Sequence, residues 1–140
     1  MGVRWLVVAS VALAACGGQA SAATLHGNVK YSKSGGIAGV IQHLTVRPDG
    51  SGVASSYERK RAFTLPQTRL RALERAVKLA DLAHTSSPKA GHGADAFAYG
   101  VEYGGHRVDW SDLSDDPPTR VLRLYDLLDS IYEKYRPRSS

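Results

Sequence analysis

Cys16 is the only cysteine among the 140 residues, so it cannot form an intramolecular disulfide or a multi-cysteine metal site. It directly follows Leu13-Ala14-Ala15 at the end of the apolar run Trp5–Ala15, and Gly17-Gly18 come after it. An apolar run of this length is typical of a signal peptide. The small residues before the cysteine resemble a bacterial lipobox, in which the thiol receives diacylglycerol and the cysteine becomes the mature N-terminus. The sequence therefore predicts a signal peptide over residues 1–15 and lipidation at Cys16.

A second processing site lies close by, because Ala20-Ser21-Ala22 has the small-x-small form of ordinary signal-peptide cleavage. We favour lipidation, since the lipobox directly abuts the apolar run, which is shorter than the roughly 20 residues of a membrane-spanning helix. Lipidation predicts a chain anchored on the outside of the cytoplasmic membrane or in the outer membrane, whereas cleavage after Ala22 predicts a secreted one. Either route removes Arg4 and lowers the net charge from +5 to +4. An exported chain of such low charge is a poor match for a nucleic-acid partner.

The side chains that could bind a metal fall into two groups. His84, His92 and Asp95 could meet around one loop, but a polar loop explains them more simply. The second group could bind calcium, yet it lacks the ligand order of an EF-hand and also suits the N-terminus of a helix: Asp109, Asp112, Asp115 and Asp116. The sequence contains no zinc-hydrolase, nucleophile-elbow, P-loop or dinucleotide motif. We therefore expect no enzyme activity, no cofactor and no metal site.

One segment, Ser32-Lys33-Ser34-Gly35-Gly36-Ile37-Ala38-Gly39, is unusual for a purely structural loop. Its three glycines surround a single bulky apolar residue, and glycine permits positive φ and a close approach of another chain. Ile37 could therefore either insert into the core or project toward a partner. Composition alone favours the first alternative, a bulge whose isoleucine joins the core.

The elements that must position these residues fit one domain, because 140 residues are too few for two cores. Strands are predicted over residues 25–31 and 37–47, and the turn Arg47-Pro-Asp-Gly50 predicts an antiparallel return over 53–59. A helix should begin at Pro66. Its apolar face within 67–83 contains Leu70, Leu73, Val77 and Ala80, widened by Leu79 and Leu82.

The second half of the chain repeats the order of strands followed by a helix. Alternating residues predict a strand over 96–103, Gly104-Gly105 predict a tight turn into a strand over 106–110, and Pro117-Pro118 should start the last helix. The result is an α+β fold, an antiparallel sheet of four to five strands with both main helices on one face. Residues 16–24 should be a flexible tether, 25–135 the single domain and 136–140 a tail. Several tyrosines should lie in the core or at its rim, or alternatively form an interface: Tyr99, Tyr103, Tyr125 and Tyr132.

These residues resemble the emfourin family, small bacterial proteins that inhibit thermolysin-like zinc metallopeptidases. The resemblance rests first on Val29-Lys-Tyr-Ser-Lys-Ser-Gly-Gly-Ile-Ala-Gly-Val40, which is similar to the family's strand and Ser-Gly-Gly-aromatic-Ala-Gly segment. Ile37 stands in place of the aromatic residue. The turn at Asp49-Gly50, the leucine-rich helix after Pro66, the strand Asp95–Tyr99 and the closing helix extend the resemblance over nearly all of residues 28–135.

The resemblance implies inhibition by occlusion of the active-site cleft. Ile37 would fill the pocket for the apolar side chain that follows the scissile bond, and the zinc would belong to the target peptidase. The implied contact residues are Tyr31, Ser34, Gly35, Gly36, Ile37, Ala38 and Gly39. We expect a lipid-anchored monomer that needs no cofactor of its own. The alternative is a surface lipoprotein that acts in adhesion or envelope interactions and has no peptidase partner.

Overall fold

The computed structural model describes residues 25–91 and 93–138. The predicted signal peptide, Cys16 and the rest of the predicted tether lie outside the described residues, as does His92. The strands are β1 (Val29–Gly35), β2 (Val40–Val46), β3 (Ser51–Ser56), β4 (Arg59–Thr64), β5 (Phe97–Tyr103) and β6 (His106–Ser111). The helices are α1 (Gln67–Ala80) and α2 (Thr119–Tyr135), with a short 3-10 turn, η1 (Leu82–His84).

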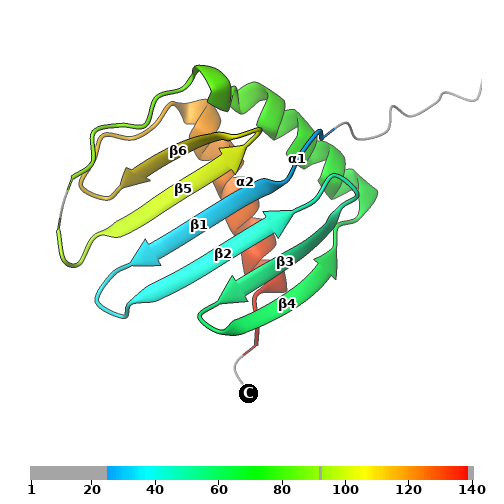
Figure 1. The fold of residues 1–140 in the computed structure, drawn as a ribbon, viewed down its shortest axis with the longest axis horizontal. Helices are drawn as coiled ribbons and strands as arrows, with labels where there is room; N and C mark the ends of the chain where they lie inside the picture. Colours follow the sequence, from blue (N-terminus) through cyan, green and yellow to red (C-terminus); the bar gives the residue numbers. More distant parts are fainter. Residues whose placement is uncertain (1–24, 92, 139–140) are drawn as a thin grey trace, which may run out of the picture.

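The strands form one antiparallel sheet in the order β4-β3-β2-β1-β5-β6 (Figure 1). The first four strands make a meander, and β5 returns after α1 to pair with the free side of β1. Two strands therefore flank β2 on one side and two flank β1 on the other, so β1 and β2 form the central hairpin. The antiparallel α+β architecture predicted from the sequence is confirmed.

The predicted number of strands is wrong, because the described part of the sheet has six strands rather than four to five. The predicted strand over 53–59 covers most of β3, the turn at Tyr57-Glu58 and the first residue of β4. The missed strand, β4, lies at the edge of the sheet and begins with Arg59-Lys60-Arg61. Charged residues protect an exposed edge from pairing with other chains, but they also hide the alternating pattern by which a strand is predicted.

The boundaries of the first predicted strand, residues 25–31, are also wrong. Strand β1 begins at Val29 and continues to Gly35, through residues that were predicted to separate two strands. Ser32 and Ser34 face the side of the sheet that carries no helix, so the strand continues there without apolar side chains.

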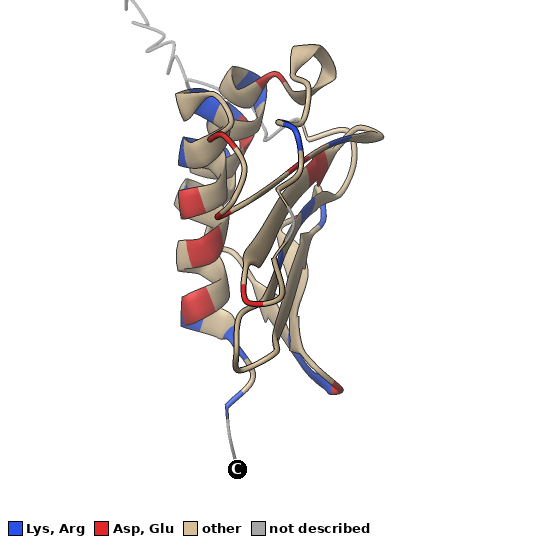
Figure 2. Cartoon of the chain, turned by 90° about the vertical axis from the view of Figure 1, so that its left-hand side faces the viewer, with Lys and Arg blue, Asp and Glu red and all other residues tan. Residues whose placement is uncertain are grey.

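Both helices pack on one face of the sheet, as predicted (Figures 1 and 2). Helix α1 buries Leu70, Leu73, Val77 and Ala80, the four residues of its predicted apolar face. Leu79 does not join them, because it lies two positions after Val77, on the opposite side of the helix, and its side chain is 70% exposed. Within residues 25–91 and 93–138, no helix is long and apolar enough to cross a membrane.

The core between sheet and helices contains a cluster of aromatic rings. The ring centroids of Tyr31 and Tyr132 are 5.8 Å apart, and those of Tyr99 and Trp110 are 5.7 Å apart. Tyr132 is buried, and Tyr99, Tyr103 and Tyr125 are half-buried, so the expectation of core and rim positions is confirmed. The buried residues of the described chain run from Leu25 to Tyr132, so a chain that begins at Ala23 retains this entire core.

Candidate functional site

The turn between β1 and β2, residues 36–39, depends on glycine at three positions. Gly35, Gly36 and Gly39 have φ values of +108°, +73° and +60°, a region that residues with a side chain rarely adopt. The amide of Gly39 donates to the carbonyl oxygen of Gly36 at 2.9 Å and closes the turn. The glycines therefore fix a tight loop at one end of the central hairpin, which we call the β1–β2 turn.

Ile37 lies at the tip of this turn, with 91% of its surface exposed. The expectation that it joins the core is wrong, because the turn lies at the end of the sheet and neither α1 nor α2 covers it (Figure 1). Exposed leucines and isoleucines are common one at a time, but here two more large apolar side chains lie beside the turn. Ile41 is 40% exposed in β2, and Tyr57 is 58% exposed in the β3–β4 turn. Ile37, Ile41 and Tyr57 give this end of the molecule an apolar surface.

The β1–β2 turn is held from two sides. The Tyr57 hydroxyl donates to the carbonyl oxygens of Gly39 and, at 3.3 Å, Ala38. On the other side, the amide of Gly36 donates to the carbonyl oxygen of Ala96 at 3.4 Å. The ring of Phe97 covers Gly36 so closely that a Cβ on that glycine would lie 2.6 Å from the ring Cζ. These contacts hold Ile37 on a turn with a defined shape.

The structure brings most of the predicted contact residues together. Ser34 and Gly35 end β1, and Gly36, Ile37, Ala38 and Gly39 form the turn. Tyr31 does not belong with them, because it is 2% exposed and its hydroxyl donates to Asp129 Oδ1 of α2 at 2.6 Å. A side chain in the core cannot contact another protein, so we leave Tyr31 out of the candidate site. Sequence reasoning missed Tyr57 of the β3–β4 turn and Phe97 of β5, which support the turn from distant parts of the chain that no local pattern connects to it.

Three members of the two groups weighed as metal ligands, Asp109, Asp112 and His84, bind neighbouring residues instead. Asp109 forms an ion pair with Arg107 at 2.8 Å, and His84 Nδ1 lies 2.8 Å from Asp81. Asp112 accepts hydrogen bonds from the Tyr99 hydroxyl at 2.6 Å and from the amide of Phe97 at 3.1 Å, which hold its pKa below the usual value. Among the described residues, no three histidines, cysteines or carboxylates gather where they could hold a metal ion.

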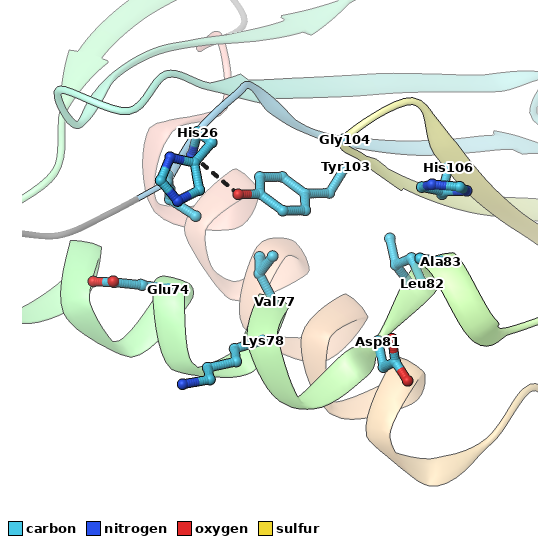
Figure 3. A pocket seen from close by; sticks show the side chains of 11 residues that line it. His26, Glu74, Val77, Lys78, Asp81, Leu82, Ala83, Tyr103, Gly104 and His106 are labelled. Carbon is cyan, nitrogen blue, oxygen red and sulfur yellow. Dashed lines mark hydrogen bonds between the residues drawn. The ribbon is translucent and has the colours of Figure 1, made fainter.

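A hollow of about 430 Å³ lies between α1 and the β5–β6 turn (Figure 3). Val77, Leu82 and Tyr103 form its apolar part, and the Tyr103 hydroxyl accepts a hydrogen bond from the amide of His26 at 3.0 Å. The imidazoles of His26 and His106 lie at opposite ends of the hollow (Figure 3). The side chains of Glu74, Lys78 and Asp81 do not point toward one another (Figure 3).

No protein-family model matches this chain, and a search of curated proteins finds none that is similar to it. The resemblance to the emfourin family therefore stays a prediction from the sequence.

Proposed function

We propose that this chain is an exported protein inhibitor of a thermolysin-like zinc metallopeptidase, and that it acts by inserting the β1–β2 turn into the active-site cleft. The observation that carries the proposal is the position of Ile37, 91% exposed at the tip of a glycine turn. The turn is supported by Tyr57 on one side and Phe97 on the other. Such a projecting apolar side chain costs solubility, so it indicates a partner with a complementary pocket.

The affinity would come from burial and from preorganisation. Complete burial of an isoleucine side chain stabilises a complex by about 1.5–3 kcal/mol. The hydrogen bonds at Gly36, Gly39 and Tyr57 already order the turn, so little conformational entropy is lost on binding. The closed turn also keeps the backbone away from the extended conformation of a cleavable strand. The inhibitor thus blocks the cleft without chemistry of its own, and the catalytic zinc belongs to the target.

Export and lipidation are part of the proposal, because thermolysin-like peptidases are commonly secreted. Cys16 would anchor the chain, and residues 17–24 would connect it to the domain. The mass of the mature N-terminus tests this part: acylation adds a large mass at Cys16, whereas cleavage after Ala22 removes Cys16 altogether.

The inhibition itself is tested by titrating residues 23–140 into a purified thermolysin-like peptidase while peptide cleavage is followed. We expect activity to fall to zero near one equivalent, and a serine peptidase in the parallel assay to keep its activity. Unchanged activity of several thermolysin-like peptidases, including any that is encoded beside this gene, would contradict the proposal. That result would favour the adhesion or envelope-interaction module.

A further inference from the structure

A groove of about 590 Å³ crosses the outer surface of the two helices. It runs between the C-terminal half of α1 and the N-terminal turns of α2, on the face that points away from the sheet. Its apolar lining is Ala72, Ala76 and Leu79, and its polar lining is Arg75, Thr119, Arg120 and Arg123. We call these residues the arginine groove.

The arginines of this groove form no ion pair with the described carboxylates. Among the described residues, neither Arg75 nor Arg123 has a carboxylate within ion-pair distance. Arg120 is held in place by hydrogen bonds from its Nε to the carbonyl oxygen of Ala80 at 3.0 Å and from its Nη2 to Thr85 Oγ1 at 2.9 Å. Like charges gathered in this way repel one another, and an anion between them would remove the repulsion. Guanidinium groups suit phosphate in particular, because they can donate two parallel hydrogen bonds.

The groove is also apolar. Leu79 is 70% exposed beside the arginines, and Ala72 and Ala76 extend its apolar surface along the groove. A ligand that matches both features has a negative head and an apolar body. The surface of an anionic phospholipid bilayer has this combination, with phosphates above and acyl chains below.

The charge on α2 changes sign after its first turns (Figure 2). Arg120 and Arg123 occupy the first turns of α2, whereas Asp126, Asp129 and Glu133 follow toward its C-terminus. An anionic surface would attract the first part and repel the second. The first turns of α2, which line the groove, are therefore the part of this helix that best suits such a surface.

We propose that the arginine groove docks this domain on an anionic lipid surface, with the arginines on lipid phosphates and Leu79 at the boundary of the acyl chains. The location of Leu25 favours a membrane over an acidic protein. Leu25 lies beside Val77 and Lys78 of α1, so the chain leaves the domain toward the predicted lipid anchor at the same end as the groove. The β1–β2 turn lies at the opposite end of β1, which spans about 20 Å (Figure 1). The groove faces away from the sheet and the turn extends in the plane of the sheet, so a docked domain would leave this turn uncovered by the bilayer.

Vesicle co-sedimentation of residues 23–140 tests this proposal, because that chain keeps the described core and lacks the acylated cysteine. We expect binding to vesicles of phosphatidylcholine with phosphatidylglycerol, no binding to phosphatidylcholine alone, and weaker binding at high salt. The double variant Arg75→Glu/Arg123→Glu should bind about tenfold or more weakly, and Leu79→Ser should also bind more weakly. The matched control Arg59→Glu/Lys60→Glu changes the net charge equally at the far edge of the sheet and should bind like the unmodified chain.

Three results would overturn the proposal. Equal binding to both kinds of vesicle would exclude a role for the arginines. An equal loss in the β4 control would show that only the net charge matters. Tight binding of soluble polyglutamate that Leu79→Ser leaves unchanged would indicate an acidic protein partner instead. Circular dichroism shows whether each variant is folded, and peptidase inhibition, which the groove variants should retain, is measured separately.

Discussion

Tyr57 is the residue on which the shape of the β1–β2 turn depends most. Its backbone has a φ of +52°, a left-handed conformation that costs a residue with a side chain on the order of 1 kcal/mol. Its hydroxyl donates to carbonyl oxygens at Ala38 and Gly39, eighteen or nineteen residues earlier in the chain. The β3–β4 turn thus supports the turn that carries Ile37.

Removal of the Tyr57 hydroxyl tests whether it orders the β1–β2 turn, because any contact of the ring with the peptidase is kept. Tyr57→Phe keeps the ring and removes only the donor, so the fold should be unchanged while the β1–β2 turn becomes less ordered. Since a net hydrogen bond is worth about 1 kcal/mol, the inhibition constant should rise about fivefold. Enzyme inhibition assays measure the effect, and amide hydrogen exchange at Ala38 and Gly39 should become faster. Unchanged inhibition with unchanged exchange would show that Tyr57 does not order the turn.

Single residues were hardest to place from the sequence where their environment is made by distant strands. Tyr31 looks like the last residue of a short strand, but it pairs with Leu44 on one side and Val101 on the other. Only the return of β5 beside β1 makes this position central and buries the ring. Ile37 is the opposite case, a side chain that lies on the surface. The glycines around it allow its side chain to lie in the core or on the surface, and the local sequence does not decide between the two.

At the scale of elements, two hairpins end in glycine turns at opposite ends of the sheet. Gly39 in the β1–β2 turn and Gly104 in the β5–β6 turn both have a φ of +60°. A Cβ at Gly104 would have open space, and at Gly39 its nearest neighbour would be the Tyr57 hydroxyl at 3.9 Å. The two positions therefore carry similar backbone strain and little steric conflict.

Because Gly39 and Gly104 have similar environments, their alanine variants form a matched pair. Gly39→Ala and Gly104→Ala should each lower the free energy of unfolding by about 1 kcal/mol, because alanine disfavours positive φ. Only Gly39→Ala should weaken inhibition, since only that turn enters the proposed cleft. Urea denaturation gives the stabilities, and titration of the peptidase gives the inhibition constants. Equal loss of inhibition in both variants would mean that general stability, and not the turn, controls binding.

Elements with strong local signals could be predicted, and those without them could not. Helix α1 has a proline at its start and apolar residues at helical spacing, so its buried face was evident. The Gly104-Gly105 turn was equally clear. Strand β4 was missed because its charged residues hide the alternating pattern of a strand. At a sheet edge such residues prevent pairing with other chains. Leu79 was wrongly added to the buried face of α1, because its apolar character alone does not show which side of the helix faces the sheet.

At the scale of the whole molecule, buried tyrosines connect the sheet to α2. Burial, together with the hydrogen bond to Asp129, raises the pKa of Tyr31 above its usual value. Burial likewise raises the pKa of Tyr125 to about 12 and also raises that of Tyr99, which donates to Asp112. The folded state therefore holds these phenolic protons more tightly than the unfolded chain, whose tyrosines have a pKa near 10.

This difference predicts a fold that is sensitive to base. The stabilisation that the raised tyrosine pKa values contribute is complete below about pH 10. It is lost as the pH rises above that value, because the unfolded chain then releases protons that the folded state retains. Each such tyrosine contributes a slope of up to about 1.4 kcal/mol per pH unit. Urea denaturation between pH 8 and pH 11 measures the slope, and Tyr125→Phe should reduce it. A free energy of unfolding that stays constant across this range would contradict the tyrosine assignments.

The measurement that tests the role of the β1–β2 turn most directly is the inhibition constant of Ile37→Asp against a thermolysin-like peptidase. Leu79→Asp is the matched control, because both side chains are large, apolar and largely exposed, and neither supports the core. We predict that Ile37→Asp raises the inhibition constant about 100-fold or more, since the pocket would lose an apolar side chain and receive a charge, whereas Leu79→Asp inhibits normally. A folded Ile37→Asp variant that inhibits as strongly as the unmodified chain would contradict insertion of the turn.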